Sequence, residues 1–274
     1  MHFHPQKCKA ISVNNRSSPL LGVLPNIQYY YSLGNVTLSF VDSEKDLGVH
    51  INKKINFDDQ CCKLLSKANK QFGLTKRTCH FVKDSRRRRV LYLTLIRSQF
   101  EHCSPVWRPY NDTAINKFES FQKSCLKWIL SEGHISYSNY GDYLSKCRQA
   151  NLLPMACKFD LNDLVLFHKV VYDLIPLSMP SYLKLFDGYT RLRSSHLDRL
   201  CYVSSLLPIE NSTLLLNKSF FYRTHSLWNA LPLDIREISL PSAFKELAIK
   251  HLWSNILSQE NGDCLEDFRQ SDIE

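Results

Sequence analysis

The chain has 274 residues, a formal net charge of +9 and an apolar content of 44%, which is enough to build cores and excludes a wholly disordered protein. No signal-like N-terminal segment and no apolar run of membrane-spanning length occurs. We therefore expect an intracellular protein, cytoplasmic or nuclear, with no membrane partner. The ten cysteines form no CxxC pair, so we expect free thiols and neither a metal nor a cofactor.

Residues 1–57 are typical of a small antiparallel β portion. Short β-type runs flank Gly34-Asn35, a residue pair that favours a two-residue hairpin turn. Residues 47–51 predict a further strand that contains Gly48. A glycine inside a strand often marks a bulge or a close backbone approach.

Helical periodicity begins at residue 58, and three helices are predicted over 58–77, 86–102 and 111–129. The second half of the middle helix is apolar on nearly every side, which indicates a central position. Side chains that can cap a helix N-terminus stand at the start of each: Asp58 or Asp59, Asp84 or Ser85, and Asn111 or Asp112.

The remaining chain predicts a helical C-terminal region over 132–256. Its expected helices cover 140–149, 155–174, 219–230 and 242–256, with irregular structure over 187–216. Residues 257–274 are rich in acids, and we expect an acidic flexible tail there.

Positive charge is concentrated between residues 60 and 97. This window holds eleven Lys or Arg and one acid, so its charge of +10 exceeds that of the whole chain. Lys63, Lys67 and Lys70 are spaced to share one helix face. Such a surface suits nucleic acid phosphates, whereas the alternative is a helix face that is simply solvated.

The run Arg86 to Arg89 is too long for all four side chains to share one helix face. We expect two or three to meet a phosphate backbone, and Arg86, Arg87 and Arg89 are the candidates. Simple solvation and a nuclear-import signal are the alternatives.

Five sequence motifs occur in order over most of the chain. They are FHPQKCKAISV at 3–13, KDLGVHINKKINF at 45–57, LYLTLIRSQFEHCSPVWRPY at 91–110, the set Phe118, Glu119 and Gln122, and SFFYRTHSLWNALPLDI at 219–235. Together they resemble the part of a non-LTR retrotransposon (LINE, jockey-like) reverse transcriptase that follows the catalytic aspartates.

The resemblance implies a mainly α fold with a small β portion, as part of a right-hand polymerase. Residues 1–57 would be a palm remnant, 58–131 a helical thumb-like domain and 132–256 the helical C-terminal region. The thumb cations would then face RNA or an RNA–DNA duplex.

The resemblance also implies roles for four residues of the palm remnant. Lys7 would approach the triphosphate, and Leu47, Gly48 and Val49 would lie near the primer end. The intact family enzyme is an RNA-directed DNA polymerase that uses Mg.

The carboxylates that would hold the catalytic metals in such an enzyme have no counterpart in this sequence. Phe57-Asp58-Asp59 lacks the intervening residue of the family's Tyr/Phe-x-Asp-Asp hairpin and precedes a helix. We therefore expect a truncated protein with no catalytic residue, which retains at most nucleic acid binding without sequence readout. An inert or protein-interaction module with no nucleic acid role is the alternative.

Overall fold

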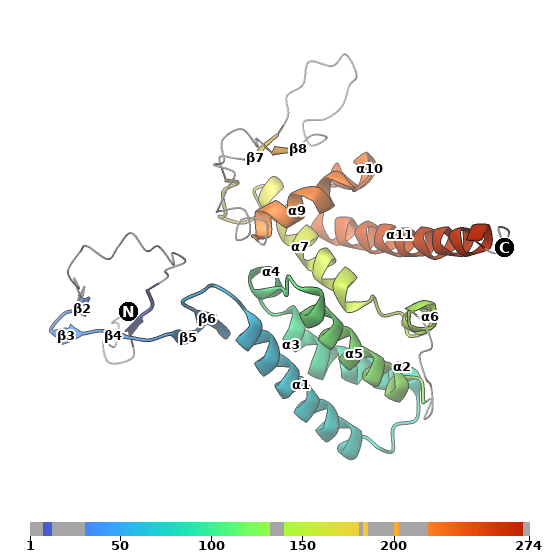
Figure 1. The fold of residues 1–274 in the computed structure, drawn as a ribbon, viewed down its shortest axis with the longest axis horizontal. Helices are drawn as coiled ribbons and strands as arrows, with labels where there is room; N and C mark the ends of the chain where they lie inside the picture. Colours follow the sequence, from blue (N-terminus) through green and yellow to red (C-terminus); the bar gives the residue numbers. More distant parts are fainter. Residues whose placement is uncertain are drawn as a thin grey trace, which may run out of the picture.

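A computed structural model of the chain describes residues 8–12, 31–131, 140–180, 183–185, 200–202 and 219–270. Within these residues the protein is mainly helical, with a few two-stranded sheets, as the sequence predicts (Figure 1). No helix in this part of the chain is both long and apolar enough to cross a membrane.

In the described residues of the N-terminal β portion, 8–12 and 31–57, the strands form three small pairs. β2 (Ser32–Leu33) and β3 (Val36–Thr37) are antiparallel across the Gly34-Asn35 turn, which confirms the predicted hairpin. β1 (Lys9–Ala10) and β4 (Ser39–Phe40) pair in parallel. The expectation of an antiparallel portion is therefore corrected for this pair, because only strands joined by a short turn must run antiparallel, whereas strands far apart in the sequence can pair in either direction.

The predicted strand over 47–51 is wrong at its start. β5 (Ser43–Asp46) and β6 (Val49–Asn52) form an antiparallel hairpin, and Leu47 and Gly48 are its turn. Their φ angles are +44° and +94°. Two successive residues with positive φ match the twist of the flanking strands, which is why such a turn closes a two-residue hairpin.

The basic window falls on α1 (Asp58–Thr78) and α2 (Ser85–Tyr92). Phe57 is the N-cap of α1 and makes no side-chain cap, so the expected Asp58 or Asp59 cap is wrong. Both acids instead occupy the first turn, where their charge favours the helix dipole. At α2 the prediction is confirmed, since the Asp84 carboxylate accepts a hydrogen bond from the Arg86 backbone N–H.

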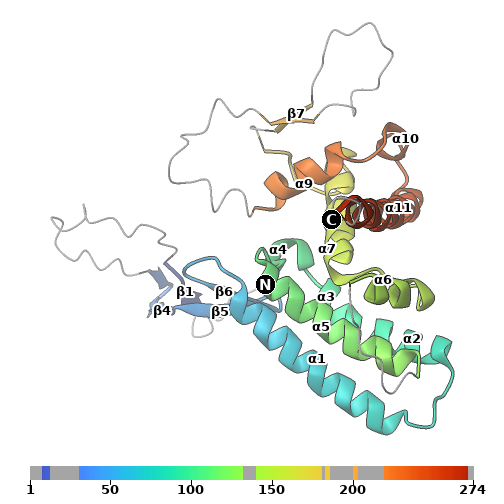
Figure 2. The same ribbon diagram turned by 45° about the vertical axis from the view of Figure 1, so that its right-hand side comes forward.

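A π-helical segment (Leu93–Arg97) and α3 (Ser98–Glu101) continue from α2. The short helix α4 (Ser104–Trp107) follows, and then α5 (Asp112–Ile129) begins after Asn111. The Asn111 side chain accepts from the Ala114 N–H at 2.6 Å, so the predicted cap is confirmed. α1 and α5 lie side by side in both ribbon views (Figure 2).

The second half of the chain contains α6 (Tyr140–Gln149), α7 (Met155–Val171), α9 (Phe220–Asn229), α10 (Leu233–Arg236) and α11 (Pro241–Gln270). The strands β7 (Leu183–Leu185) and β8 (Leu200–Tyr202) form an antiparallel pair within or beside the region expected to be irregular. α11 continues to Gln270, so the helix includes most of the segment that we expected to be a flexible tail.

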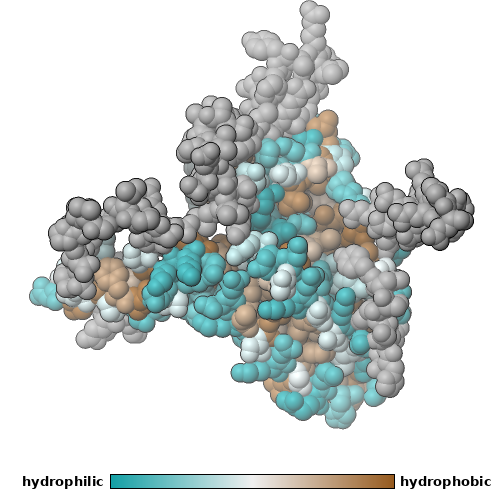
Figure 3. Space-filling model, viewed as in Figure 1, coloured by the Kyte–Doolittle hydropathy of each residue, from teal (hydrophilic) through white to brown (hydrophobic). Residues whose placement is uncertain are grey.

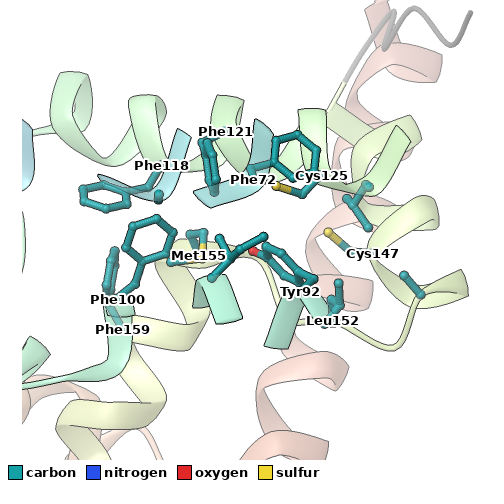
Figure 4. Close-up of a cluster of buried hydrophobic side chains, with 14 of the residues drawn as sticks. Phe72, Tyr92, Phe100, Phe118, Phe121, Cys125, Cys147, Leu152, Met155 and Phe159 are labelled. Carbon is teal, nitrogen blue, oxygen red and sulfur yellow. The ribbon is translucent and has the colours of Figure 1, made fainter. Parts of the chain in front are cut away.

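The buried side chains that the structure describes form two clusters that meet along α7. The first lies between α1, the α2–α3 helix, α5 and α6, and reaches Phe159 (Figure 4). The second packs the rest of α7 against α9, α10 and α11, around Phe167, Trp228 and Phe244. The first cluster thus extends into α6 and α7, beyond the division expected at residue 131.

Two residues of the α5 motif, Glu119 and Gln122, hold three helices together. Glu119 accepts hydrogen bonds from the Tyr143 hydroxyl and from the Ala156 N–H at the start of α7. Gln122 donates to the Leu153 carbonyl at 3.0 Å. Both side chains are buried, so these polar contacts fix how α5, α6 and α7 pack.

Two arginines from different sequence motifs meet at one buried carboxylate. Asp163 on α7 has a side chain that is 1% exposed, and it lies 2.7 Å from Arg108 Nη1 and 2.7 Å from Arg223 Nε. Arg223 also donates to the Pro105 carbonyl. Arg108 further pairs with Asp160 at 2.6 Å. The cluster joins the α4 segment and α9 to α7, which is a structural role.

Candidate nucleic-acid interface

The three predicted lysines form a continuous stripe on α1. Lys63, Lys67 and Lys70 are all exposed. None of them forms an ion pair with a carboxylate in the described part of the chain. Lys63 Nζ lies 3.1 Å from His50 Nδ1 on β6. Burial and then the charge of Lys63 lower the pKa of His50, so this imidazole favours its neutral form.

The structure adds cations that the prediction left out. Arg77 lies seven residues after Lys70 and is exposed on the same face of α1. Lys76 and Lys83 are also exposed, and Lys76 Nζ lies 5.4 Å from the centre of the Phe72 ring. The two-turn spacing from Lys70 to Arg77 was a signal in the sequence that could have identified Arg77.

The four-arginine run is divided between surface and interior. Arg86 and Arg87 are exposed, and Arg87 lies 3.7 Å from the Asp84 carboxylate. Arg88, which we did not select, is buried and donates to the carbonyls of Val82 and Trp128. This division follows from helix geometry, because one of four consecutive side chains must point inward.

Arg89 is a correction to the predicted interface. Its side chain is half-buried and donates to the Asn151 carbonyl at 2.9 Å. Asn151 lies in the turn after α6 and has a φ of +50°. Arg89 therefore holds α2 against this turn, and phosphate contact would require it to give up that hydrogen bond.

The exposed cations are spread along α1 rather than gathered at one point. α1 has 21 residues and so is about 30 Å long. Lys63 lies near its N-terminal end beside the β5–β6 hairpin, while Arg86 follows its C-terminal end by a short loop. The basic surface is therefore an elongated strip, which suits a linear polyanion better than a compact anion.

The residues expected near a primer end lie at the tip of the β5–β6 hairpin. Leu47 is 86% exposed, and its carbonyl lies 3.1 Å from His102 Nε2. A Cβ on Gly48 would lie 3.2 Å from the same nitrogen, so the expected close approach occurs there. Val49 is buried beneath the turn and is a core residue, not a contact residue. Lys7 lies outside the described residues.

A groove runs between α1 and α5 on a different face of α1. It has a volume of about 610 Å³ and is lined mainly by polar side chains. The lining residues are Leu65, Asn69, Thr113, Asn116, Lys117, Ser120, Phe121 and Ser124. Nothing in the sequence patterns pointed to this groove, because it depends on the packing of two helices that are distant along the chain.

The ranges that the structure describes contain carboxylates, imidazoles and thiols, which are the side chains that could bind a metal or react. There, no group of three or more His, Cys, Asp or Glu side chains is placed to hold a metal ion. The eight cysteines from Cys8 to Cys157 are free thiols. Burial raises the pKa of the Cys61 thiol to about 12, and that of Cys147 to about 12, which suppresses their reactive thiolate forms.

The view in Figure 3 shows hydrophilic and hydrophobic residues interspersed over the described part of the first half of the chain. Single exposed apolar side chains are normal on a protein surface. This face therefore does not argue for a membrane or for one large apolar contact.

Comparison with known proteins adds no family to these observations. No family model matches the chain, and no curated protein or solved structure matches it either.

Proposed function

We propose that this chain is a non-catalytic, nucleic-acid-binding protein of the reverse transcriptase type, which holds RNA or an RNA–DNA duplex through its phosphate backbone. The observation that carries the proposal is the row of exposed cations on α1 that lack acidic partners in the described chain. The order of the five sequence motifs supports the family assignment. The missing Tyr/Phe-x-Asp-Asp hairpin supports the absence of catalysis.

The physical reason lies in the spacing of the charges. Lys63 and Lys67 are four residues apart, and Lys67 and Lys70 are three apart, so like charges are neighbours along the helix. Each such pair destabilises an isolated helix by roughly 0.2–0.5 kcal/mol. A polyanion relieves this repulsion and releases its own counterions on binding, which gives affinity without sequence readout.

Fluorescence anisotropy with a labelled RNA–DNA hybrid tests the proposal. We expect binding at ~50 mM salt that weakens steeply towards ~200 mM. Replacing both Lys67 and Lys70 by Ala should reduce the slope of log K against log salt by about 1.8, since each phosphate contact contributes about 0.9. The matched control replaces Lys245 and Lys250, which are exposed on α11 and change the net charge equally.

Three results would contradict the proposal. Absence of binding at ~50 mM salt would exclude a nucleic acid role. An equal reduction of the salt slope in the Lys245/Lys250 control would mean that binding depends on net charge alone and not on the α1 stripe. Primer extension by the purified chain that a metal chelator abolishes would contradict the non-catalytic assignment.

One observation favours the alternative of a protein-interaction module. Leu74 and Phe81 are 47% and 69% exposed at the C-terminal end of α1 and in the loop that follows. Exposed apolar side chains at one end of a helix suit contact with another protein. A stable complex or self-association that Phe81→Ser abolishes, without any nucleic acid binding, would support this alternative.

A further inference from the structure

The groove between α1 and α5 is longer than one cleft. A smaller cleft of about 210 Å³ shares Leu65, Thr113 and Lys117 with the larger one. It extends the groove to the N-terminal ends of both helices, at Asp58 and Asn111. From Thr113 to Ser124 the α5 wall covers about 17 Å at 1.5 Å per residue. The groove is therefore an elongated channel rather than a closed ligand cavity.

Its lining is rich in hydrogen-bond donors. Asn69 and Ser124 already donate to helix carbonyls, of Leu65 and Ser120 respectively. The side chains of Thr113, Asn116 and Ser120 form no hydrogen bond with another described residue, so they are available to a ligand. Hydroxyl and amide donors of this kind supply many of the contacts that proteins make with nucleic acid phosphates and sugars.

The charge of the groove favours an anionic occupant. Lys117 is the only charged residue that lines the larger cleft, and it has no ion-pair partner in the described chain. Asp58 lies only at the end of the smaller cleft. An enclosed site for a small apolar ligand would be lined mainly by hydrophobic side chains, and this lining is not.

We propose that the groove between α1 and α5 holds the sugar–phosphate backbone of one nucleic acid strand, with Lys117 as its single charged contact and the neutral side chains of α5 as its other contacts. This inference rests on the proposed function and adds a second contact surface to it. One strand offers a phosphate about every 3.4 Å along a duplex axis and at a longer spacing along the strand itself, so the α5 wall is long enough to meet more than one phosphate.

The groove and the lysine stripe lie on different sides of α1. Leu65 and Asn69 line the groove, whereas Lys67 lies two residues from each and so points to the other side of the helix. Substitutions in one surface therefore leave the other intact, and the two contributions can be separated by mutation.

The test compares variants of the full chain in anisotropy titrations with the labelled RNA–DNA hybrid at several salt concentrations. Ser120 is exposed on α5, so Ser120→Phe places an apolar side chain in the groove. Both residues are neutral, so the net charge of the protein is unchanged. Ser254→Phe, at an exposed serine on α11, is the matched control. Lys117→Ala removes the single charge.

We expect Ser120→Phe to weaken binding roughly tenfold with an unchanged salt slope, since it blocks neutral hydrogen bonds and removes no charged contact. Lys117→Ala should reduce the slope by about 0.9. Ser254→Phe should bind as the unmodified chain does.

Each other result decides against the groove. If the unmodified chain binds and the Lys67/Lys70 variant is weakened, but Ser120→Phe and Lys117→Ala bind normally, the groove is excluded and the proposed function stands. An equal loss in Ser120→Phe and Ser254→Phe also excludes it, because the effect is then not local. If the unmodified chain does not bind the hybrid, the proposed function fails and the groove assignment fails with it.

Discussion

The Asp163 cluster allows the sharpest prediction about stability. Asp163→Ala removes a carboxylate that accepts hydrogen bonds from Arg108 at 2.7 Å and from Arg223 at 2.7 and 3.1 Å. The arginine side chains are only 14% and 19% exposed, so water cannot fully replace the lost partner. Burial lowers the pKa of Arg108, but the charges of Asp160 and Asp163 outweigh it and raise that pKa above its usual value.

The expected cost follows from this geometry. Removing one partner of a buried ion pair typically costs about 3–5 kcal/mol, because it leaves an uncompensated charge. The whole free energy of unfolding of a protein is only about 5–15 kcal/mol. With a urea dependence of about 2 kcal/mol per molar, we expect the midpoint of urea unfolding to fall by about 2 M.

Far-UV circular dichroism in urea measures this midpoint. A double-mutant cycle with Arg223→Ala should show coupling of about 0.5–3 kcal/mol, because the two residues share one contact. Glu246→Ala is the control, since Glu246 and Lys250 form an exposed pair on α11 that should leave the midpoint unchanged. A loss below about 1 kcal/mol for Asp163→Ala, or additive effects in the cycle, would refute a structural role for the cluster.

Two further predictions concern single residues. Burial lowers the pKa of His168, although the hydrogen bond from its Nε2–H to the Ile238 carbonyl opposes this shift. Protonation of His168 therefore favours the unfolded state. The contribution of the neutral side chain to the free energy of unfolding should be complete above the ordinary His pKa of about 6.5 and should fall as the pH drops below it. His168→Gln should reduce this pH dependence of the urea midpoint, whereas the exposed His80→Gln should not; equal dependence in both variants would contradict the assignment. Gly48→Ala should destabilise the protein in thermal unfolding more than Gly34→Ala, because both have positive φ but only Gly48 would also crowd His102, and equal losses would exclude that contact.

Much of the secondary structure could be predicted from local patterns. The turn at Gly34-Asn35, the caps at Asp84 and Asn111, and most helices follow from turn chemistry, capping and helical periodicity. The stripe Lys63, Lys67 and Lys70 could be predicted for the same reason, since spacing along one helix fixes which side chains share a face.

The errors arise where a residue's neighbours are distant in sequence. Leu47 and Gly48 form a turn, and only the contact with His102 shows why that backbone must approach so closely. Arg88 and Arg89 have the same charge as Arg86, but Trp128 and Asn151 draw them into hydrogen bonds. Sequence could predict that the four arginines divide, but not which of them turn inward.

The sequence by itself determined a mainly helical chain, its concentrated positive charge and the resemblance of its motifs, because composition and periodicity are local properties. Only the tertiary structure decided which contacts the motif residues make. It brings Arg108 and Arg223 to Asp163, and Glu119 to the start of α7, which makes these motif residues packing contacts. It also creates the groove between α1 and α5, since a groove exists only where two helices far apart along the chain are held side by side.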